Sequence, residues 1–380
     1  PDLRRHAREL VDSGIQGTDL HLGFYAPMAR WVARHWGDRL RIVWPAVENR
    51  ALLRDRIYLL GLEAETPGLD HAKLTARQWI ERMKGPDETD GAFVVRRFAS
   101  VEWPEHLRDT LLDELELPLV LRGDADTPSR TRARAPGGTV RFQGGPMRAE
   151  RPDLKRALRL RPVSIRRVDL AEGRAYLELA REAMVTRDRA LDAFAGGDPA
   201  DVLLVDAGEG LEFAVIGARP GWRMLIESVH GWLTLRNRVP IGYVLSATMF
   251  RSTEVAYNVF DNWRGGEAGW VYGRVLATCR ALFGSDTFTV YPYQLGHGNA
   301  EGLASGAWWF YQKLGFRPRD PETVALMEAE LRAMKRDSKH RSSRAVLTRL
   351  ARANVYYSVG RPRKAVIGEI PLERIGLAGT

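Results

Sequence analysis

Three features in the second half of the chain combine residue types that could do chemistry. Glu254 lies on a predicted strand, where side-chain alternation turns its carboxylate away from the apolar residues. Arg264, Gly265 and Gly266 stand between that strand and a predicted helix, and the unpaired N–H groups and positive dipole end of a helix start suit a phosphate. Tyr311 falls on the apolar face of a later helix, so its hydroxyl needs a hydrogen-bond partner. Each feature also has a structural explanation: a solvent-facing strand edge, a tight turn and a packed phenol.

The first elements that must position these residues are two strands. Apolar residues occupy the odd positions from Val239 to Met249, and this two-residue period predicts a strand. Arg251 and Ser252 interrupt the pattern and predict a hairpin turn. The next run, which ends at Val259, repeats the period and predicts a second strand with Glu254 on its polar face.

A helix, a strand and a second helix follow. After the glycines, an apolar stripe with helical spacing ends at Gly284, a natural helix stop. Residues 287–293 predict a strand, and Pro292 near its end lacks the N–H that a sheet ladder needs. Two neighbouring strands that part at this proline would leave a slot between them. An apolar stripe from Leu303 to Leu314 predicts the helix that carries Tyr311.

In this stretch the chain resembles the GCN5-related N-acetyltransferase superfamily. The segment Val259-x-x-x-x-Arg264-Gly265 is similar to the end of that family's central strand and the start of its pyrophosphate loop. The helix and strand that follow have the expected order and length. The most specific similarity is to the family's closing helix and lies in Ala307-x-x-Phe310-Tyr311-x-Lys313-Leu314-Gly315-Phe316. The resemblance covers residues 160–318.

The resemblance implies an acyl-CoA co-substrate, acetyl-CoA or another, and no metal. The pantetheine arm would pair with the strand near its end, and the pyrophosphate would sit on the N–H groups of the glycine-rich loop. Tyr311 would protonate the departing thiolate and Glu254 would deprotonate an acceptor amine, because an attacking amine must be neutral and a thiolate leaves more easily beside a proton donor. The cofactor-binding residues that the resemblance implies are Val259, Phe260, Arg264, Gly265, Gly266, Ala268, Gly269 and Asn299.

One position of the loop departs from the family pattern. Glu267 stands fourth, counted from Arg264, where the family has a glycine. Either the loop is one residue shorter and uses Gly266 and Ala268, or a carboxylate lies near the diphosphate. In the second arrangement the carboxylate would repel the cofactor unless Arg264 or another cation offsets its charge. The loop that holds Asn299 is also longer than the usual family spacing.

Composition and charge narrow the class of protein. The chain has 380 residues, so two domains or one elaborated domain are expected. Its hydrophobic fraction is 44% and its formal net charge is +9, and a basic surface favours anionic ligands. The single cysteine, Cys279, falls on an apolar helical stripe and excludes an internal disulfide, and no Cys/His cluster predicts a metal site. No apolar run reaches the ~18–20 residues of a membrane span. The N-terminus has no apolar signal core, so we expect a cytoplasmic protein without a membrane partner.

The predicted fold class is α+β, with a mixed, mostly antiparallel sheet flanked by helices as in the family that the chain resembles. We expect four regions: a helix-rich N-terminal domain, a linker, an acyltransferase-like domain and a helical C-terminal extension, over residues 1–122, 123–150, 151–320 and 321–380. Local patterns further predict a strand, a helix and a second tail helix over residues 91–101, 222–235 and 345–356.

Three functions from different classes are compatible with these patterns. The first is transfer of an acyl group, most simply acetyl, from acyl-CoA to the amine of a small molecule or peptide. The second is a catalytically inactive module that keeps the fold and binds a ligand or a partner. The third is transfer of an aminoacyl group from a charged tRNA, for which the basic surface would bind nucleic acid. A fold alone does not choose among them.

Overall fold

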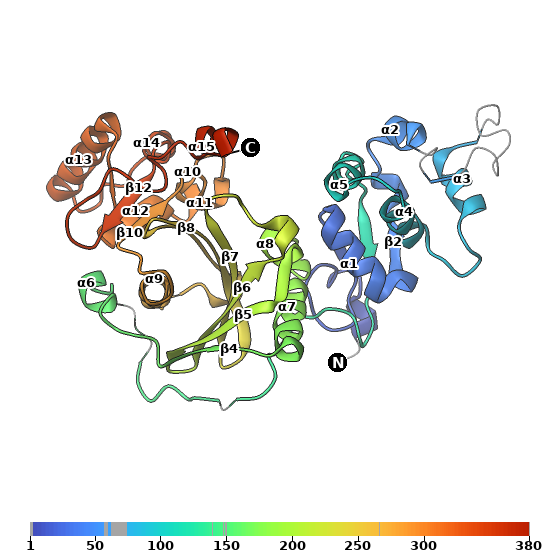
Figure 1. Ribbon diagram of the computed structural model, residues 1–380, viewed down its shortest axis with the longest axis horizontal. Coiled ribbons are helices and arrows are strands. Elements are labelled where there is room, and N and C mark those ends of the chain that lie inside the picture. The colour runs from blue at the N-terminus through green and yellow to red at the C-terminus, as the bar shows by residue number, and fades with distance from the viewer. Residues whose placement is uncertain are drawn as a thin grey trace. The chain divides into compact units, whose positions relative to one another are not determined.

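The structure is a computed structural model, and it describes residues 3–56, 60–61, 74–138, 140–146, 148, 150–265 and 267–379. The chain divides into two compact units (Figure 1). Unit 1 consists of Pro1–Arg134 and Glu178–Gly196, and unit 2 of Ala135–Leu177 and Gly197–Thr380. The first crossing between the units falls within the expected linker. The return of residues 178–196 to unit 1 is a feature that the sequence patterns do not predict.

Unit 1 is helix-rich and also contains a small sheet. Its strands have the order β1-β3-β2 and pair in antiparallel fashion. The elements are β1 (Leu20–Leu22), α1 (Ala26–Trp36), β2 (Leu40–Ile42), α2 (Arg50–Asp55), α3 (Ala76–Met83), α4 (Asp90–Ala99), α5 (Glu105–Asp113), β3 (Leu119–Leu121) and α8 (Asp192–Ala195).

The predicted strand over residues 91–101 is wrong, because this segment forms α4. The hydroxyl of Thr89 accepts a hydrogen bond from the backbone N–H of Ala92 and caps the helix. Residues 91–95 are all buried, so the segment presents a continuous apolar run. Such a run has no visible period and cannot be assigned to a strand or a buried helix by pattern alone.

Unit 2 is built on a nine-stranded sheet in the order β11-β12-β10-β9-β8-β7-β6-β5-β4. All neighbouring strands are antiparallel except β9 and β10, which are parallel. The strands are β4 (Ser164–Arg167), β5 (Gly197–Gly208), β6 (Leu211–Ala218), β7 (Ser228–Arg236), β8 (Val239–Met249), β9 (Ser252–Val259), β10 (Thr287–Val290), β11 (Arg317–Pro318) and β12 (Val355–Ser358). A large, mostly antiparallel sheet with helices agrees with the predicted α+β class.

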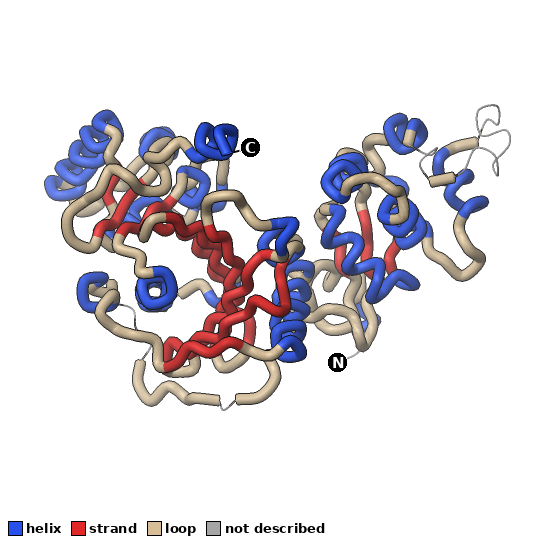
Figure 2. The backbone as a smooth tube through the Cα atoms, viewed as in Figure 1, coloured by secondary structure: helices blue, strands red, loops and turns tan. Residues whose placement is uncertain are grey.

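Helices cover both faces of this sheet. Figures 1 and 2 show α7 and α9 on opposite faces, and the main core of unit 2 lies between the sheet and α9. The helices are α6 (Leu154–Ala157), α7 (Leu170–Val185, whose second half belongs to unit 1), α9 (Ala268–Phe283), α10 (Pro292–Leu295), α11 (Ala300–Ala304), α12 (Ala307–Lys313), α13 (Pro321–Arg336), α14 (Arg344–Leu350) and α15 (Leu372–Gly379). None of the described helices is long and apolar enough to cross a membrane.

The predicted hairpin and the helix after it are confirmed. Strands β8 and β9 are joined by Phe250 and Arg251, whose φ angles of 47° and 64° fit a tight two-residue turn. Helix α9 ends at Gly284, which adopts the left-handed conformation with φ of 66°. Cys279 is fully buried on the inner face of α9, so it is a packing residue.

The predicted helix over residues 222–235 is wrong. The chain makes a 3-10 turn at Pro220–Trp222 and then forms β7. This strand is paired with β6 on one side and β8 on the other, and Trp232, Leu233 and Leu235 are fully buried. Because β7 is paired on both sides and buried on both faces, its sequence does not alternate between apolar and polar residues, and this alternation is the pattern that predicts a strand.

The C-terminal extension is not wholly helical. The predicted second tail helix ends at Leu350, and Val355–Ser358 forms β12, which lies in the sheet between β10 and β11. β-Branched and aromatic residues such as Val355 and Tyr356 favour a strand at this position. Residues beyond 320 therefore complete the sheet of unit 2.

The tail's contribution to the core leads to a stability prediction. Leu350 is fully buried in the core of unit 2, whereas Leu377 on α15 is 79% exposed. Leu350→Ala should lower the free energy of unfolding of the full chain by about 2–5 kcal/mol, because it leaves a cavity. Leu377→Ala is the matched control and should stay within about 0.5 kcal/mol. Urea unfolding followed by tryptophan fluorescence measures both, and equal effects would contradict the assignment of the tail to the core.

Candidate active site

Strands β9 and β10 part after a short parallel pairing. Only Ser252–Glu254 pair with β10, opposite Thr287–Thr289. Beyond Glu254, β9 continues for five residues to Val259 with β8 as its neighbour in the sheet. Strand β10 ends at Val290, and Pro292 begins α10 instead of ending the strand. The strands do not part at Pro292 as predicted: β10 ends one residue after its pairing with β9, the chain then turns into α10, and β9 continues beyond it.

The diverging part of β9 has backbone groups that point away from β8. The N–H of Phe260 donates to the carbonyl of Ile241 at 2.9 Å, so even-numbered residues of β9 bond to β8 in this regular antiparallel ladder. Beyond the pairing with Thr289, the odd-numbered residues Tyr257 and Val259 then direct their N–H and C=O groups to the side where β10 has ended, and the carbonyl of Val259 accepts a hydrogen bond from Nε of Arg264 at 3.3 Å. This strand edge can pair with the amide groups of an extended ligand.

Glu254 lies at the point where the two strands part. It is opposite Thr289 on β10 and faces away from the core that α9 covers, since Val255 packs in that core. Burial, and secondly the carboxylate of Glu227, raises the pKa of Glu254 to about 7. Its carboxylate makes no hydrogen bond to another described residue. A carboxyl group with this pKa can take a proton from a nucleophile near neutral pH.

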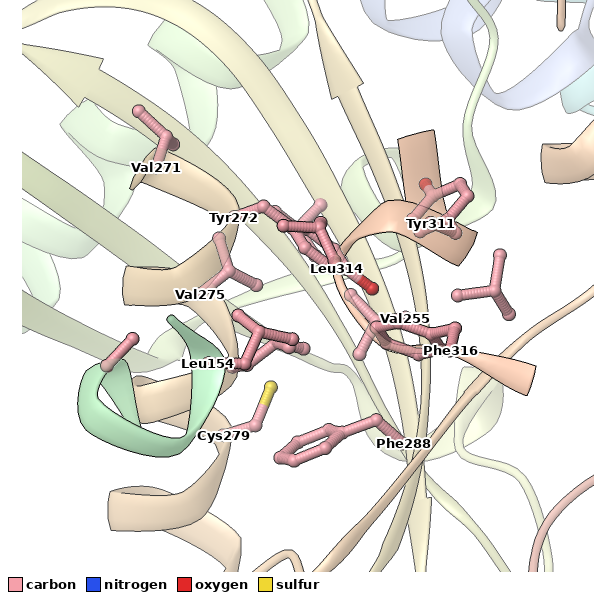
Figure 3. Packing of buried hydrophobic residues seen from close by; sticks show 14 of the residues in the cluster. Leu154, Val255, Val271, Tyr272, Val275, Cys279, Phe288, Tyr311, Leu314 and Phe316 are labelled. Carbon is pink, nitrogen blue, oxygen red and sulfur yellow. The ribbon is translucent and has the colours of Figure 1, made fainter. Parts of the chain in front are cut away.

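Tyr311 lies on the opposite face of β9, on α12. Its side chain is 3% exposed and packs edge-on against Tyr272 of α9 and Phe316, with ring centroids 5.4 Å and 5.8 Å away (Figure 3). Burial raises the pKa of the Tyr311 hydroxyl, so the phenol stays protonated at neutral pH. Its hydroxyl has no hydrogen-bond partner among the described residues, and a protonated, unpartnered phenol can donate to a ligand.

Two further tyrosines near Tyr311 are not identified by sequence reasoning. Tyr257 of β9 and Tyr272 of α9 lie with ring centroids 5.2 Å apart. Burial, and secondly the phenol of Tyr311, raises the pKa of Tyr257, whose hydroxyl donates to the carbonyl of Ala268 at 3.3 Å. The hydroxyl of Tyr272 is buried and has no partner in the described structure. Tyr257 could have been noted from its place on the inner face of β9, but the position of Tyr272 depends on tertiary packing.

The loop before α9 holds Arg264 in place. Its guanidinium contacts the carboxylates of Asp261, at 2.9 Å, and of Glu301, and its Nε donates to the carbonyl of Val259 at 3.3 Å. The carbonyl of Gly265 accepts from the N–H of Ala268 at 3.3 Å. Arg264 therefore organises the loop through acidic partners. Gly266, one of the expected loop residues, lies outside the described residues.

The carboxylate of Glu267 is offset by a cation, and that cation is Arg236. Glu267 precedes the first turn of α9 and pairs with Arg236 of β7 at 3.6 Å. Arg236 also lies 5.2 Å from the ring centre of Trp270, and its Nη1 is buried without a partner in the described part of the chain. The first N–H groups of α9 have no partner within the helix. A second arginine, Arg148, lies 4.8 Å from the same ring and pairs with Glu209 at 2.6 Å, so both arginines beside Trp270 have a carboxylate partner.

Three expected cofactor-binding residues have structural roles. The N–H of Phe260 donates to the carbonyl of Ile241 in β8. Asn299 caps α11 through a bond from the N–H of Gly302 at 3.0 Å, and its amide donates to the carbonyl of Tyr293 at 3.1 Å. At Gly269, a Cβ atom would approach Pro152 to 3.0 Å, so this glycine permits close packing on α9.

The structure thus has a carboxylate with a pKa of about 7 on one face of β9, a protonated phenol on the other face, and a strand edge that β10 leaves unpaired. Such an arrangement can remove a proton from one group and supply a proton to another. The described residues contain no group of three His, Cys, Asp or Glu side chains that could hold a metal ion. No family model, no curated protein and no solved structure matches this chain.

Proposed function

We propose that unit 2 binds an acyl-CoA, most simply acetyl-CoA, and transfers its acyl group to an amine. The observation that carries this proposal is the edge of β9 that lies beyond its pairing with β10 and includes Tyr257, whose ring lies near the phenol of Tyr311. Pantetheine is an extended chain with two amide groups. Both amides can bond to the outward N–H and C=O groups of a strand edge, as peptides do in β-augmentation.

The start of α9 supports the placement of the diphosphate. Free N–H groups and the positive end of the helix dipole favour an anion there. Arg236 neutralises Glu267 and retains an unpartnered N–H at Nη1. This arrangement corresponds to the second possibility raised by the sequence, in which a cation offsets the carboxylate.

Glu254 and Tyr311 supply the two proton transfers of the proposed reaction. The amine nitrogen attacks the thioester carbonyl carbon, a C–N bond forms and the C–S bond breaks. Glu254 accepts the proton that the amine loses, and Tyr311 donates a proton to the departing sulfur. The two side chains come from opposite faces of β9, so a ligand paired with the free edge of β9 would have one of them on each side.

The proposed function predicts that the chain binds acetyl-CoA. Acetyl-CoA at one hundred times its Kd should stabilise the full chain by about 2.7 kcal/mol in thermal melting. Glu267→Gln should tighten the Kd for CoA and Arg236→Gln should weaken it, each by about two- to fivefold, which corresponds to about 1 kcal/mol or less of binding free energy. Calorimetric titration measures both.

Absence of any stabilisation by CoA would favour the inactive module, and binding of tRNA in its place would favour the aminoacyl transferase.

The second prediction separates chemistry from binding. Tyr311→Phe should lower the rate of CoA thiol release with primary amines by about 10²–10⁴-fold, while the Kd for acetyl-CoA changes little, because only the proton donor is removed. Tyr293→Phe is the matched control, since Tyr293 is 59% exposed. Turnover that Tyr311→Phe leaves unchanged would remove Tyr311 from the acid role.

The third prediction is a pH dependence. Below pH about 7 Glu254 is protonated and cannot accept a proton, so kcat/KM should rise with pH and level off above about pH 7. Glu254→Gln should lower kcat/KM and abolish this inflection. Glu227→Gln should move the inflection to lower pH, because it removes the second cause of the raised pKa. An inflection that persists in Glu254→Gln would assign the base to another group.

A further inference from the structure

Strand β4 is the outer strand at one end of the nine-stranded sheet of unit 2. It pairs with β5 over Ser164–Arg167, and in the described structure no strand lies on its other side. All four of its residues are exposed. The outer edge of such a strand presents unpaired N–H and C=O groups, which are a template for another extended chain.

A groove runs beside this edge. It has a volume of about 680 Å³ and is lined by the segment Leu158–Ile165 on one side and by Ala277, Arg280 and Ala281 of α9 on the other. Three large apolar side chains in the lining are exposed: Leu160 by 49%, Val163 by 69% and Ile165 by 41%. Exposed apolar side chains that cluster beside a free sheet edge are uncommon on the surface of a monomeric protein, and such clusters are typical of interaction sites.

All charged side chains that line the groove are positive. Arg159, Arg161 and Arg280 are exposed and have no carboxylate partner among the described residues. By contrast, Arg166 and Arg167 of β4 pair with Glu172 and Asp201, at 2.5 Å and 3.2 Å. The positive charge of the strand itself is therefore neutralised, while that of the groove is available to a partner.

We propose that this groove binds an extended acidic peptide, which adds as a strand to β4. Its backbone would bond to the free edge, its apolar side chains would contact Val163 and Ile165, and its carboxylates would pair with Arg159, Arg161 and Arg280. The lining contains no aromatic side chain on which nucleotide bases could stack.

The test uses a fluorescein-labelled six-residue peptide of alternating Glu and Val, and fluorescence anisotropy with the full chain. Arg280→Glu should weaken binding by about five- to tenfold, because it replaces an attraction by a repulsion. Arg332→Glu is the matched control: it changes the net charge equally, but Arg332 lies on α13 outside the groove. Val163→Ser should also weaken binding, whereas Leu225→Ser, at another exposed position, should not.

Several outcomes would overturn the proposal. Equal losses in Arg280→Glu and Arg332→Glu would show general attraction between a basic protein and an acidic peptide. Absence of binding at 1 mM peptide and low salt would remove the site. A dimer by light scattering that Val163→Ser dissolves would assign the edge to a second copy. Because the lining of the groove includes neither Glu254, Tyr311 nor any residue of β9, these results do not depend on acyl-CoA binding.

Discussion

The early separation of β10 from β9 is the constraint on which the candidate site depends. Strand β10 has four residues, and all four pair with β12, whereas only three pair with β9. Pro292 has no N–H to continue the ladder and begins α10, so the chain turns away from the sheet. The last part of β9 therefore keeps unpaired backbone groups beside the core of unit 2. The C-terminal strand β12 holds β10 in this position from its other side, which gives the tail a role in forming the site.

Polar groups without partners lie on both faces of this part of β9. The hydroxyl of Tyr272 is buried and unpartnered on the face covered by α9, and Glu254 has a raised pKa on the other. Leaving a buried donor or acceptor unsatisfied costs about 1–3 kcal/mol. A ligand that supplied hydrogen bonds to these groups would recover part of that free energy on binding, so the same burial that weakens the free protein would strengthen the complex.

The parts of the fold that could be predicted are those in which apolar residue types recur with a clear period along the sequence. Alternation identified β8 and β9, and the helical stripe and Gly284 identified α9. Prediction failed at α4 and β7, where burial on all sides removes the period. It also failed at β12, a strand of four residues that follows a helix and is stabilised by pairing with β10. Glu254 and Tyr311 were found because each lies on a clearly patterned element, whereas Tyr272 and Arg236 are brought to the site by packing.

Glu267 illustrates why a local motif is insufficient to decide on a phosphate site. Judged within its loop, a carboxylate at the start of α9 opposes anion binding. In the folded chain that carboxylate is paired with Arg236, which lies 31 positions earlier, as follows from the two residue numbers. The guanidinium of Arg236 also packs against the ring of Trp270, which lies in the first turn of α9. Helix α9 therefore helps to position the cation that pairs with Glu267. The net charge near those N–H groups is therefore a property of the contact between β7 and α9. A sequence in which this contact forms can carry an acidic residue at this position without an unpaired negative charge at the start of α9.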